Sequence, residues 1–329
     1  MPKFKAVLIA GSDVAVCFKL YCGKSDTELA AVFSGSSARH GAEAESFKDA
    51  VIIIDASVPN EATNEIISNL SPGRGYIAIT ADIKTGFDYL NRGAVDMIVK
   101  PDLLSPLTSE GFIYSLCTKI KMSARQGAEI YQRDLKYTGP GISNKIIAIG
   151  SSTGGTEIIL SIIKNLPHNC PPVLIAQHMP PVFTKLYAQR LHNLCAMSVW
   201  EAKNGDELRA GLVLIAPGDY QMRVVYKNNR YFTELTSGEK INGHAPSADA
   251  LFGSIARNAG SKSIGVILTG MGSDGAKGLL EMRRSGSFTI GQDEKSSTVY
   301  GMPRVAYEIG AVVKQADMND IASEILKAL

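Results

Sequence analysis

A glycine-rich turn between an apolar run and an amphipathic segment is the feature that most constrains the fold of this chain. The run Ile146–Ile149 ends at Gly150, and apolar residues recur at helical spacing after Thr156. This pattern predicts a strand, a tight turn and a helix. Gly150, Ser152 and Gly154 fit the G-x-S-x-G nucleophile elbow, in which glycines tolerate strained backbone and expose the middle serine. Ser152 is therefore a candidate nucleophile.

Phosphate-binding turns are the main alternatives for this stretch. A dinucleotide-binding fingerprint requires glycine at position 152, and a P-loop requires a lysine and a hydroxyl residue directly after Gly155. The sequence meets neither requirement. A turn that merely connects two elements stays open as a third interpretation, and residues elsewhere in the chain must decide between it and a nucleophile.

Composition limits the class of protein. The chain has 329 residues, of which 45% are hydrophobic and 20% charged, which is enough for two globular domains with separate cores. The net charge is +2, and there is no dense basic run with interleaved aromatics, so we expect no nucleic-acid partner. No apolar stretch approaches the roughly 18 residues that span a bilayer, and no signal peptide is recognisable. We therefore expect a cytoplasmic protein without membrane insertion.

The five cysteines are scattered along the chain and form no C-x-x-C pair. An odd number without metal-ligand spacing suits reduced thiols better than a disulfide framework or a zinc site. We assign them no function.

The first part of the chain alternates short β-like runs with segments that fit helices. The runs are AVLIA, ELAAVF, AVIIID, GYIAIT and DMIVK. Such alternation predicts an α/β fold, a parallel sheet with helices on both faces. We place this domain at residues 1–124, a polar linker at 125–144 and a second domain at 145–329.

Candidate site residues of the first domain follow its β-like runs, because ligands bind at the carboxyl ends of strands in such sheets. Asp55 and Thr80 end two runs, and Lys100 ends the last. These positions resemble the receiver domain of response regulators, which has a flavodoxin-like fold. The resemblance implies that Asp55 accepts a phosphoryl group, that the Thr80 hydroxyl responds to it, and that Lys100 pairs with it.

The chain departs from receivers at the acidic pair that follows the first strand and holds Mg²⁺. Gly11 and Ser12 occupy those two positions, whereas Mg²⁺ needs well-placed oxygen ligands in near-octahedral geometry. Asp13 lies one residue later, where a helix begins, and we interpret it as the N-cap. Mg²⁺ binding, and with it phosphorylation of Asp55, is therefore not expected.

The second domain presents its polar candidates after β-like runs as well. His178 follows a run ending at Gln177, and Asp274 lies in a glycine-rich loop after another run. The stretch 197–236 contains several β-like runs, with Asn228-Asn229 as a hairpin turn, and we interpret it as an antiparallel insert or edge. We therefore expect a doubly wound, Rossmann-like sheet with this insert.

A serine hydroxyl is a weak nucleophile at neutral pH, so it needs a neutral histidine that is oriented by a carboxylate. Ser152, His178 and Asp274 can supply these roles. All three follow β-like runs, which places them along one edge of a doubly wound sheet. Their chain order differs from that of α/β-hydrolases, chymotrypsin and subtilisin, so none of those families is implied. His244 is the other histidine of this domain that we keep as a site candidate.

Five segments of the second domain together resemble the chemotaxis receptor methylesterase family, whose catalytic domain follows a receiver. They are IAIGSSTGGTE, IAQHMPP, HAPSADALF, GVILTGMGSDGAKG and GQDEKSSTVYGMPR, in the family's order. The resemblance implies hydrolysis of glutamate methyl esters on the cytoplasmic domains of chemoreceptors, for chemotactic adaptation, and deamidation of particular glutamines there. It implies no cofactor for the esterase. The implied partners are methyl-accepting chemoreceptors and a chemotaxis histidine kinase.

The resemblance also implies the roles of individual residues. Ser152 would be the nucleophile, His178 the general base and acid, and Asp274 the orienting carboxylate. Thr153, His244 and Met271 match residues that line the family's site. Glycines flank Met271, so its backbone amide can approach a tetrahedral oxyanion closely and stabilise it.

Two other classes of function stay open from the sequence alone. The chain could be a non-catalytic signalling adaptor that uses the receiver-like domain, or a nucleotide-binding enzyme. A purely adaptor role gives no chemical reason for a serine, a histidine and an aspartate at three strand ends. Release of methanol from a methylated receptor separates an esterase from an adaptor, and a thermal shift with nucleotide would identify the third class.

The elbow register predicts unequal effects for its two neighbouring serines. Ser152→Ala should nearly abolish esterase activity, because loss of the nucleophile in such a set costs on the order of 10⁶ in turnover. Ser151→Ala should retain most of the activity, since successive side chains at the turn point apart. Methanol release by the two variants measures both effects, and the reverse ranking would show that the register is wrong.

Overall fold

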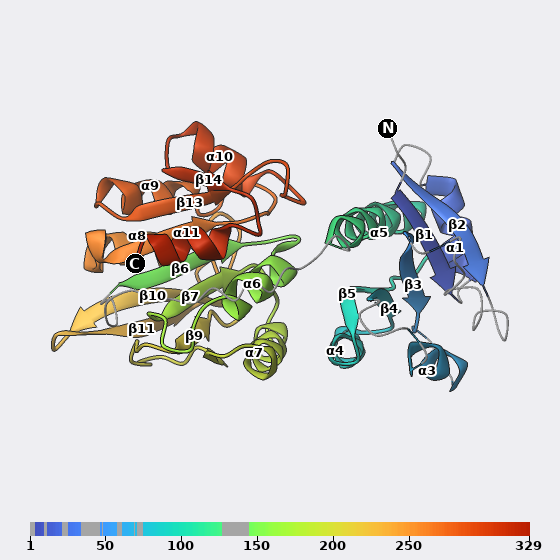
Figure 1. Cartoon of the computed structure of the whole chain (residues 1–329), viewed down its shortest axis with the longest axis horizontal. Coiled ribbons are helices and arrows are strands. Elements are labelled where there is room, and N and C mark those ends of the chain that lie inside the picture. Colours follow the sequence, from blue (N-terminus) through green and yellow to red (C-terminus); the bar gives the residue numbers. More distant parts are fainter. Residues whose placement is uncertain are drawn as a thin grey trace. The chain divides into compact units, whose positions relative to one another are not determined.

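The structure is a computed structural model. It describes residues 4–9, 12–21, 26–33, 47, 49–57, 61–68, 70, 75–126 and 145–329. The chain divides into two compact units, residues 1–130 and residues 131–329, and each has its own sheet (Figure 1). The last helix of the first unit, α5 (Pro106–Gln126), includes two residues that we expected in the linker. The rest of the expected linker, residues 127–144, lies outside the described residues.

The first unit contains a five-stranded parallel sheet in the order β2-β1-β3-β4-β5. Its strands are β1 (Phe4–Ile9), β2 (Thr27–Phe33), β3 (Val51–Asp55), β4 (Tyr76–Thr80) and β5 (Ala94–Val99). Besides α5, its helices are α1 (Ser12–Tyr21), α3 (Glu61–Ser68) and α4 (Ile83–Asn91). This strand order is that of flavodoxin-like folds, so the predicted architecture is confirmed.

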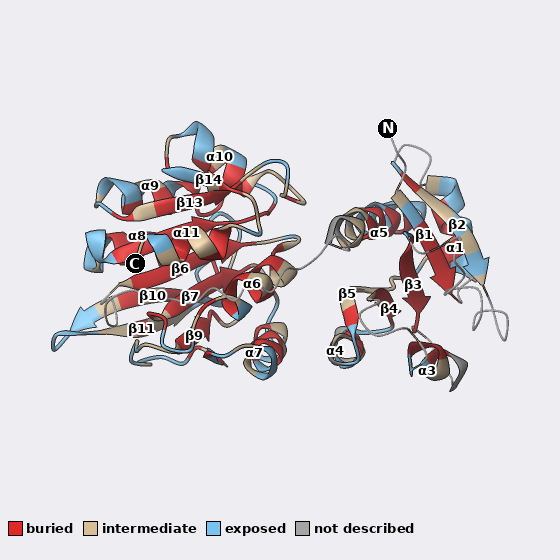
Figure 2. Ribbon diagram, in the orientation of Figure 1, coloured by how far each residue is buried: buried red, intermediate tan, exposed pale blue. Residues whose placement is uncertain are grey.

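Alternate residues of β3 explain why helices cover both faces of this sheet. Ile53 packs in a cluster with α1 and α5, whereas Ile52 and Ile54 pack in a second cluster with α3 and α4. Successive side chains of a strand point to opposite faces, so a strand that is apolar throughout needs cover on both. Figure 2 shows the strand interiors of this unit as buried.

The second unit contains a seven-stranded parallel sheet in the order β14-β13-β12-β6-β7-β9-β8. Its strands are β6 (Ile146–Ser151), β7 (Val173–Gln177), β8 (Ser198–Glu201), β9 (Leu212–Ile215), β12 (Ser263–Ile267), β13 (Phe288–Gln292) and β14 (Lys314–Ala316). Its helices are α6 (Gly155–Lys164), α7 (Phe183–Leu194), α8 (Ala248–Asn258), α9 (Ala276–Arg284), α10 (Met302–Glu308) and α11 (Ile321–Lys327). The doubly wound fold that we predicted is confirmed.

The direction of winding reverses between β6 and β12. From β6 the sheet grows through β7 toward β8, and from β12 it grows through β13 toward β14. Polar loops that follow β6 and β12 therefore diverge above one crevice, which is where open α/β sheets bind their ligands. The fold alone therefore predicts that a site lies among the loops after β6, β7 and β12.

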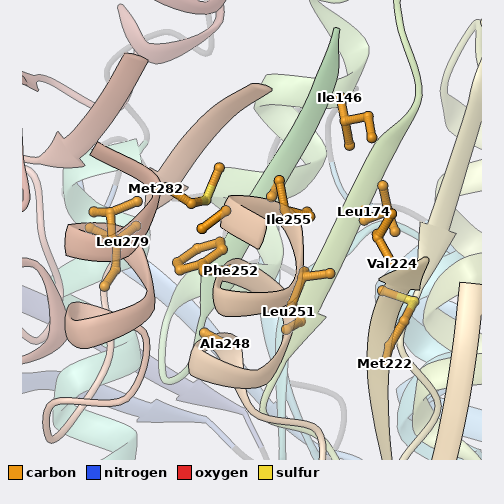
Figure 3. Packing of buried hydrophobic residues seen from close by; sticks show 14 of the residues in the cluster. Ile146, Leu174, Met222, Val224, Ala248, Leu251, Phe252, Ile255, Leu279 and Met282 are labelled. Carbon is orange, nitrogen blue, oxygen red and sulfur yellow. The ribbon is translucent and has the colours of Figure 1, made fainter. Parts of the chain in front are cut away.

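The core on one side of this sheet is built around α8. Figure 3 shows Leu251, Phe252 and Ile255 of this helix among the buried residues of the cluster. Phe252 is fully buried. A side chain at Gly150, at the end of β6, would collide with Ala248 and Phe252. Glycine at that position therefore lets the start of α8 lie directly against the strand that carries the elbow.

The stretch 197–236, which we expected to be an antiparallel insert or edge, is antiparallel only in part. β10 (Tyr220–Lys227) and β11 (Arg230–Ser237) form an antiparallel hairpin, and its turn residues Asn228 and Asn229 have left-handed backbone, with φ of 52° and 63°. β8 and β9, in contrast, pair in parallel with the main sheet. The reason is that β9 is a continuous buried apolar run, which is typical of parallel strands covered on both faces.

Four of the cysteines are free thiols in the described residues: Cys17, Cys117, Cys170 and Cys195. Cys22 lies outside the described residues. Burial raises the pKa of Cys170 to about 12, so this thiol stays protonated at neutral pH. Among the residues that the structure describes, no helix is both long and apolar enough to cross a membrane.

Candidate active site

The elbow lies between β6 and α6, and its two serines differ in how far they are exposed to solvent. Ser151 is the last residue of β6 and is fully buried, with its hydroxyl 3.4 Å from the Thr269 carbonyl. Ser152 is half-buried, and Gly154 has left-handed backbone with φ of 84° directly before α6, which glycine adopts without strain. Of the two hydroxyls, that of Ser152 is therefore the accessible one.

Backbone hydrogen bonds tie Ser152 to both neighbouring strands. Its N–H donates to the Thr269 carbonyl after β12, at 3.0 Å. Its carbonyl accepts from Nε2 of Gln177, the last residue of β7, at 2.9 Å. The N–H of His178 donates to the Ser151 carbonyl at 3.0 Å. The elbow and the histidine are thus held together by main chain before any side chain contributes.

His178 and Asp274 are in direct contact. Nε2 of the imidazole lies 2.8 Å from Oδ2 of the carboxylate, and both side chains are at least nine-tenths buried. The Asp274 carboxylate also accepts hydrogen bonds from the N–H of Ala248 at 2.7 Å, from the Ser247 hydroxyl at 2.6 Å and from Nδ2 of Asn242 at 3.0 Å. The start of α8 therefore points at this carboxylate, an arrangement in which the helix dipole favours a negative charge.

The pKa of Asp274 reflects this environment. Burial by itself would raise it, but the hydrogen bonds from His178, Ser247, Asn242 and the Ala248 amide outweigh burial and lower the pKa to about 2. Donors that stabilise the charged form have this effect. Asp274 is thus a carboxylate throughout the neutral range, and the charge is available to orient a histidine.

The contact with Asp274 also fixes the tautomer of His178. A carboxylate can only accept a hydrogen bond, so Nε2 carries the proton and Nδ1 of the neutral ring has the free lone pair. Nδ1 is buried and has no hydrogen-bond partner within the described residues. The hydroxyl of Ser152 forms no hydrogen bond with it in this structure. An unsatisfied buried acceptor beside the elbow is suited to receive a proton when a substrate binds.

Three further predicted residues lie around this pair. The ring of His244 stacks on that of His178, with centroids 3.8 Å apart and an interplanar angle of 11°. Met271 is 75% exposed in the loop after β12. Thr153 is exposed at the elbow, and its carbonyl accepts from the Thr269 hydroxyl at 3.1 Å. The backbone amides of Thr153 and Met271 donate to no other group in the described part of the chain.

Sequence reasoning missed the residues that hold Asp274. Ser247 begins α8, where its hydroxyl both donates to Asp274 and caps the helix at the Ala250 amide. Asn242 has left-handed backbone with φ of 52°, which is uncommon outside glycine. A serine directly before an apolar helix is a recognisable N-cap signal, but nothing in the sequence shows that its proton faces the carboxylate. Asn242 carries no such signal.

The charged candidate residues of the first unit, Asp13, Asp55 and Lys100, form an ionic cluster. Nζ of Lys100 lies 2.8 Å from Oδ2 of Asp55 and 2.8 Å from Oδ2 of Asp13, and 3.3 Å from the Ser57 hydroxyl. The N-cap interpretation of Asp13 is wrong, because Asp13 lies inside the first turn of α1. The Thr80 hydroxyl donates to the Asp82 carbonyl at 2.9 Å and takes no part in the cluster.

The cation that contacts both carboxylates of the ionic cluster is the Lys100 ammonium. Burial would lower the pKa of Lys100, but its hydrogen bonds to Asp13 and Asp55 outweigh burial and raise it. No group of three or more histidine, cysteine or acidic side chains suited to a metal occurs within the described ranges. Gly11, one of the two positions of the missing acidic pair, lies outside those ranges.

Comparison with known proteins identifies the same region of the chain. The family model described as CheB methylesterase matches residues 147–325. A protein-glutamate methylesterase/protein-glutamine glutaminase 2 of Syntrophomonas wolfei is 45% identical over 289 residues, which cover 86% of this chain and 85% of the relative. A protein of the same name from Hahella chejuensis is 48% identical over 303 residues, with 84% and 82% covered. Both alignments are too long to be confined to the second unit.

A solved structure gives the same result for the fold. The crystal structure of the Thermotoga maritima CheB methylesterase catalytic domain matches with a TM-score of 0.56 and 39% sequence identity, covering 57% of this chain and 100% of that chain. A doubly wound sheet with a histidine–carboxylate pair beside an elbow serine is typical of a serine hydrolase. The chain belongs to the CheB methylesterase family.

The low pKa of Asp274 predicts a specific acid sensitivity of the second unit. The unfolded carboxyl has a pKa near 3.9, so between about pH 4 and pH 2 the unfolded state binds the proton and the folded state does not. Asp274 therefore contributes stability that is complete above about pH 4, of the order of 2–3 kcal/mol, and that is lost as the pH falls through about 2.

Urea unfolding can measure this contribution, because Trp200 is the only tryptophan of the chain and lies in the second unit. The difference in unfolding free energy between the native chain and Asp274→Asn should shrink between about pH 4 and pH 2. A difference that stays constant over this range would show that the Asp274 carboxylate is not preferentially stabilised in the folded state.

Proposed function

We propose that the second unit hydrolyses glutamate methyl esters on the cytoplasmic domains of chemoreceptors. The observation that carries the proposal is the buried His178–Asp274 pair beside the accessible hydroxyl of Ser152. Family membership supports the substrate class, since the relatives are named protein-glutamate methylesterase/protein-glutamine glutaminase. The chain then acts in the cytoplasm as a hydrolase in chemotaxis and two-component signalling, with no cofactor in the ester hydrolysis.

The first half of the reaction forms an acyl-enzyme. Oγ of Ser152 attacks the ester carbonyl carbon while Nδ1 of His178 takes the hydroxyl proton, and Asp274 stabilises the imidazolium that forms. The carbonyl oxygen becomes an oxyanion, to which the backbone N–H of Met271 donates. Collapse of this intermediate breaks the bond to the methoxy group, and the proton on Nδ1 leaves with it as methanol.

The second half returns the enzyme to its starting state. Water attacks the acyl carbon and gives its proton to Nδ1 of His178, and the second tetrahedral intermediate expels Ser152, which recovers that proton. The product is a glutamate side chain. When the side chain is glutamine, the same steps release ammonia instead of methanol, so the one site accounts for both activities in the relatives' names.

Methanol release from a methylated chemoreceptor fragment tests the function. The native chain should release methanol, and His178→Ala should lose nearly all of it, since removing the histidine of such a set costs about as much as removing all three members. An Asn228→Gly variant, altered in the β10–β11 turn, is a control that should release methanol at the native rate. No release by the native chain from a fragment that is shown to be methylated would contradict the proposal.

We further propose that the first unit regulates the second without Mg²⁺-dependent phosphoryl transfer. The support is the contact of Lys100 with both Asp13 and Asp55, together with the absence of the acidic pair at positions 11 and 12. Without a divalent ion, the negative charges of Asp55 and of an incoming phosphoryl group are poorly screened from each other. Regulation then comes from binding of a protein partner by the receiver-like surface, with a chemotaxis histidine kinase as one candidate.

Intact-mass spectrometry after treatment with acetyl phosphate and Mg²⁺ tests this second proposal. We expect little or no addition of a phosphoryl group to the native chain and no change in its methanol release. Asp55→Asn serves as the matched control, and its mass should be equally unaffected. Stoichiometric addition of one phosphoryl group that disappears in Asp55→Asn, with a rise in activity, would show that the unit is a functional receiver.

A further inference from the structure

Two helices, α8 and α9, begin beside the candidate active site, and each donates a backbone amide to an aspartate at the start of the other. The N–H of Ala248, the first residue of α8, donates to Oδ2 of Asp274, just before α9, at 2.7 Å. The N–H of Gly278, in the first turn of α9, donates to Oδ1 of Asp249, the second residue of α8, at 2.7 Å. Amides of a first helical turn have no partner within their own helix. The two helix starts therefore satisfy each other.

The reaction steps above account for Asp274 but not for Asp249. No hydrogen bond joins Asp249 to His178 or to the elbow within the described residues. Oδ2 of Asp249 instead accepts from Nδ2 of Asn242 at 2.8 Å, and the same nitrogen donates to Oδ1 of Asp274 at 3.0 Å. A side-chain amide nitrogen carries two protons, so Asn242 bridges two carboxylates that would otherwise repel each other.

The first turns of α8 and α9 are in direct contact. A Cβ atom at Gly278 would lie 2.9 Å from the Asp249 carbonyl oxygen and 2.8 Å from Cβ of Phe252. A Cβ atom at Gly275, which has left-handed backbone with φ of 86°, would lie 2.8 Å from Cβ of Ala248. Glycine at both positions allows this close approach. The hydrogen bond from Gly278 to Asp249 thus lies inside a tight contact between the two helices.

This contact holds the far end of the loop that carries Met271 and Asp274. The beginning of the loop, after β12, is held by the hydrogen bond from the Leu268 N–H to the Gly150 carbonyl at 2.9 Å. The end of the loop leads directly into α9, which Asp249 holds against α8. The loop is therefore held at both ends, and a displacement of about 1 Å at such a site can cost about 10²-fold in rate.

The charge of Asp249 destabilises the fold at neutral pH. Burial raises the pKa of Asp249 most, and the neighbouring Asp274 carboxylate also raises it. Hydrogen bonds from Gly278, Asn242 and Gly275 lower the pKa, but the net shift is upward. A carboxyl whose pKa is higher in the folded state than in the unfolded state favours folding less once it is ionised, so this effect is absent in acid and develops as the pH rises above about 4. A carboxylate that reduces stability is typical of a position that serves function.

We propose that Asp249 is a positioning residue that holds the start of α9 against α8 and so keeps the loop of Met271 and Asp274 in place. The inference deepens the proposed function and rests on it. It predicts that position 249 must supply an acceptor for the Gly278 amide and that a negative charge there is dispensable. Asparagine supplies this acceptor through its Oδ1 atom, whereas alanine supplies none.

Three variants of the full chain test the inference by methanol release from a methylated chemoreceptor fragment. Asp249→Ala should lower kcat about 10- to 100-fold with KM within about threefold, and Asp249→Asn should keep kcat within about threefold of the native value. Glu281→Ala is the matched control. Glu281 of α9 pairs with Arg257 of α8 at 3.7 Å, with both side chains more than half exposed. This variant removes an exposed carboxylate between the same two helices and should leave kcat unchanged.

Urea unfolding followed by Trp200 fluorescence separates positioning from loss of the fold. Asp249→Asn should be at least as stable as the native chain at pH 7, because it removes a buried charge. If this stable variant is nevertheless as slow as Asp249→Ala, the charge itself is required and the inference is wrong. That result can be read even if Asp249→Ala does not fold.

Two other results would also overturn the inference. The loss in Asp249→Ala could fall entirely on KM, which would make Asp249 a substrate contact. Asp249→Ala could instead be as active as Glu281→Ala, which would show that the Gly278 amide needs no acceptor for the reaction to proceed.

A second readout separates failure of the inference from failure of the proposed function. A fluorophosphonate forms a bond between its phosphorus and Oγ of Ser152 and releases fluoride, while the hydroxyl proton passes to His178, so no methylated receptor is needed. Labelling should keep its native rate in Asp249→Asn and Glu281→Ala and should slow about tenfold or more in Asp249→Ala. If the native chain is labelled but releases no methanol, the substrate assignment is wrong, and the labelling rates still decide the positioning role.

Discussion

The buried carboxylate of Asp274 is the group on which the arrangement of the second unit depends. A charge this deeply buried is costly unless donors surround it, and here the donors come from separate parts of the chain. His178 follows β7, the Ala248 amide and the Ser247 hydroxyl lie at the start of α8, and Asn242 lies in the turn before that helix. Satisfying this one charge therefore fixes the relative positions of a strand end, a helix start and a turn.

The fold makes that arrangement possible through close packing. The winding of the sheet reverses between β6 and β12, so the loops that carry Ser152 and Asp274 leave neighbouring strands at the same edge. Gly150 allows α8 to lie against β6, which aims the helix start at Asp274. A larger residue at position 150 would displace the helix and leave the carboxylate without its backbone donor. The chemistry of the site thus depends on a glycine that takes no part in it.

The two units use the same edge of a parallel sheet in different ways. In the second unit a carboxylate orients a histidine whose other nitrogen, Nδ1, is left without a partner. In the first unit the carboxylates of Asp13 and Asp55 are both paired with Lys100. An unsatisfied acceptor is suited to proton transfer, whereas a closed ion pair is a stable structure that a reaction would have to break. The first unit therefore holds its carboxylates in ion pairs, whereas the second leaves one acceptor open.

The sequence was sufficient for those features that depend on local pattern. Strand–turn–helix spacing predicted the elbow around Ser152, and the apolar runs predicted both parallel sheets. Contacts between distant segments were not predictable in the same way. The sequence around Asp13 favours a helix cap, because nothing in it shows that Lys100 lies beside this carboxylate in the folded chain. Asn242 and Ser247 contact Asp274 only because the start of α8 packs against the loop after β12. The run Leu212–Ile215 could be assigned to the parallel sheet only once both of its faces were seen to be covered.

The central claim is that Ser152 is the one serine activated by the His178–Asp274 pair. The most direct measurement is to treat the full chain with a fluorophosphonate and to locate the adduct by peptide mapping and mass spectrometry. We predict a single adduct on Ser152 that forms in the native chain and is lost in His178→Ala. An adduct on Ser151, or labelling of Ser152 that persists without His178, would contradict the account.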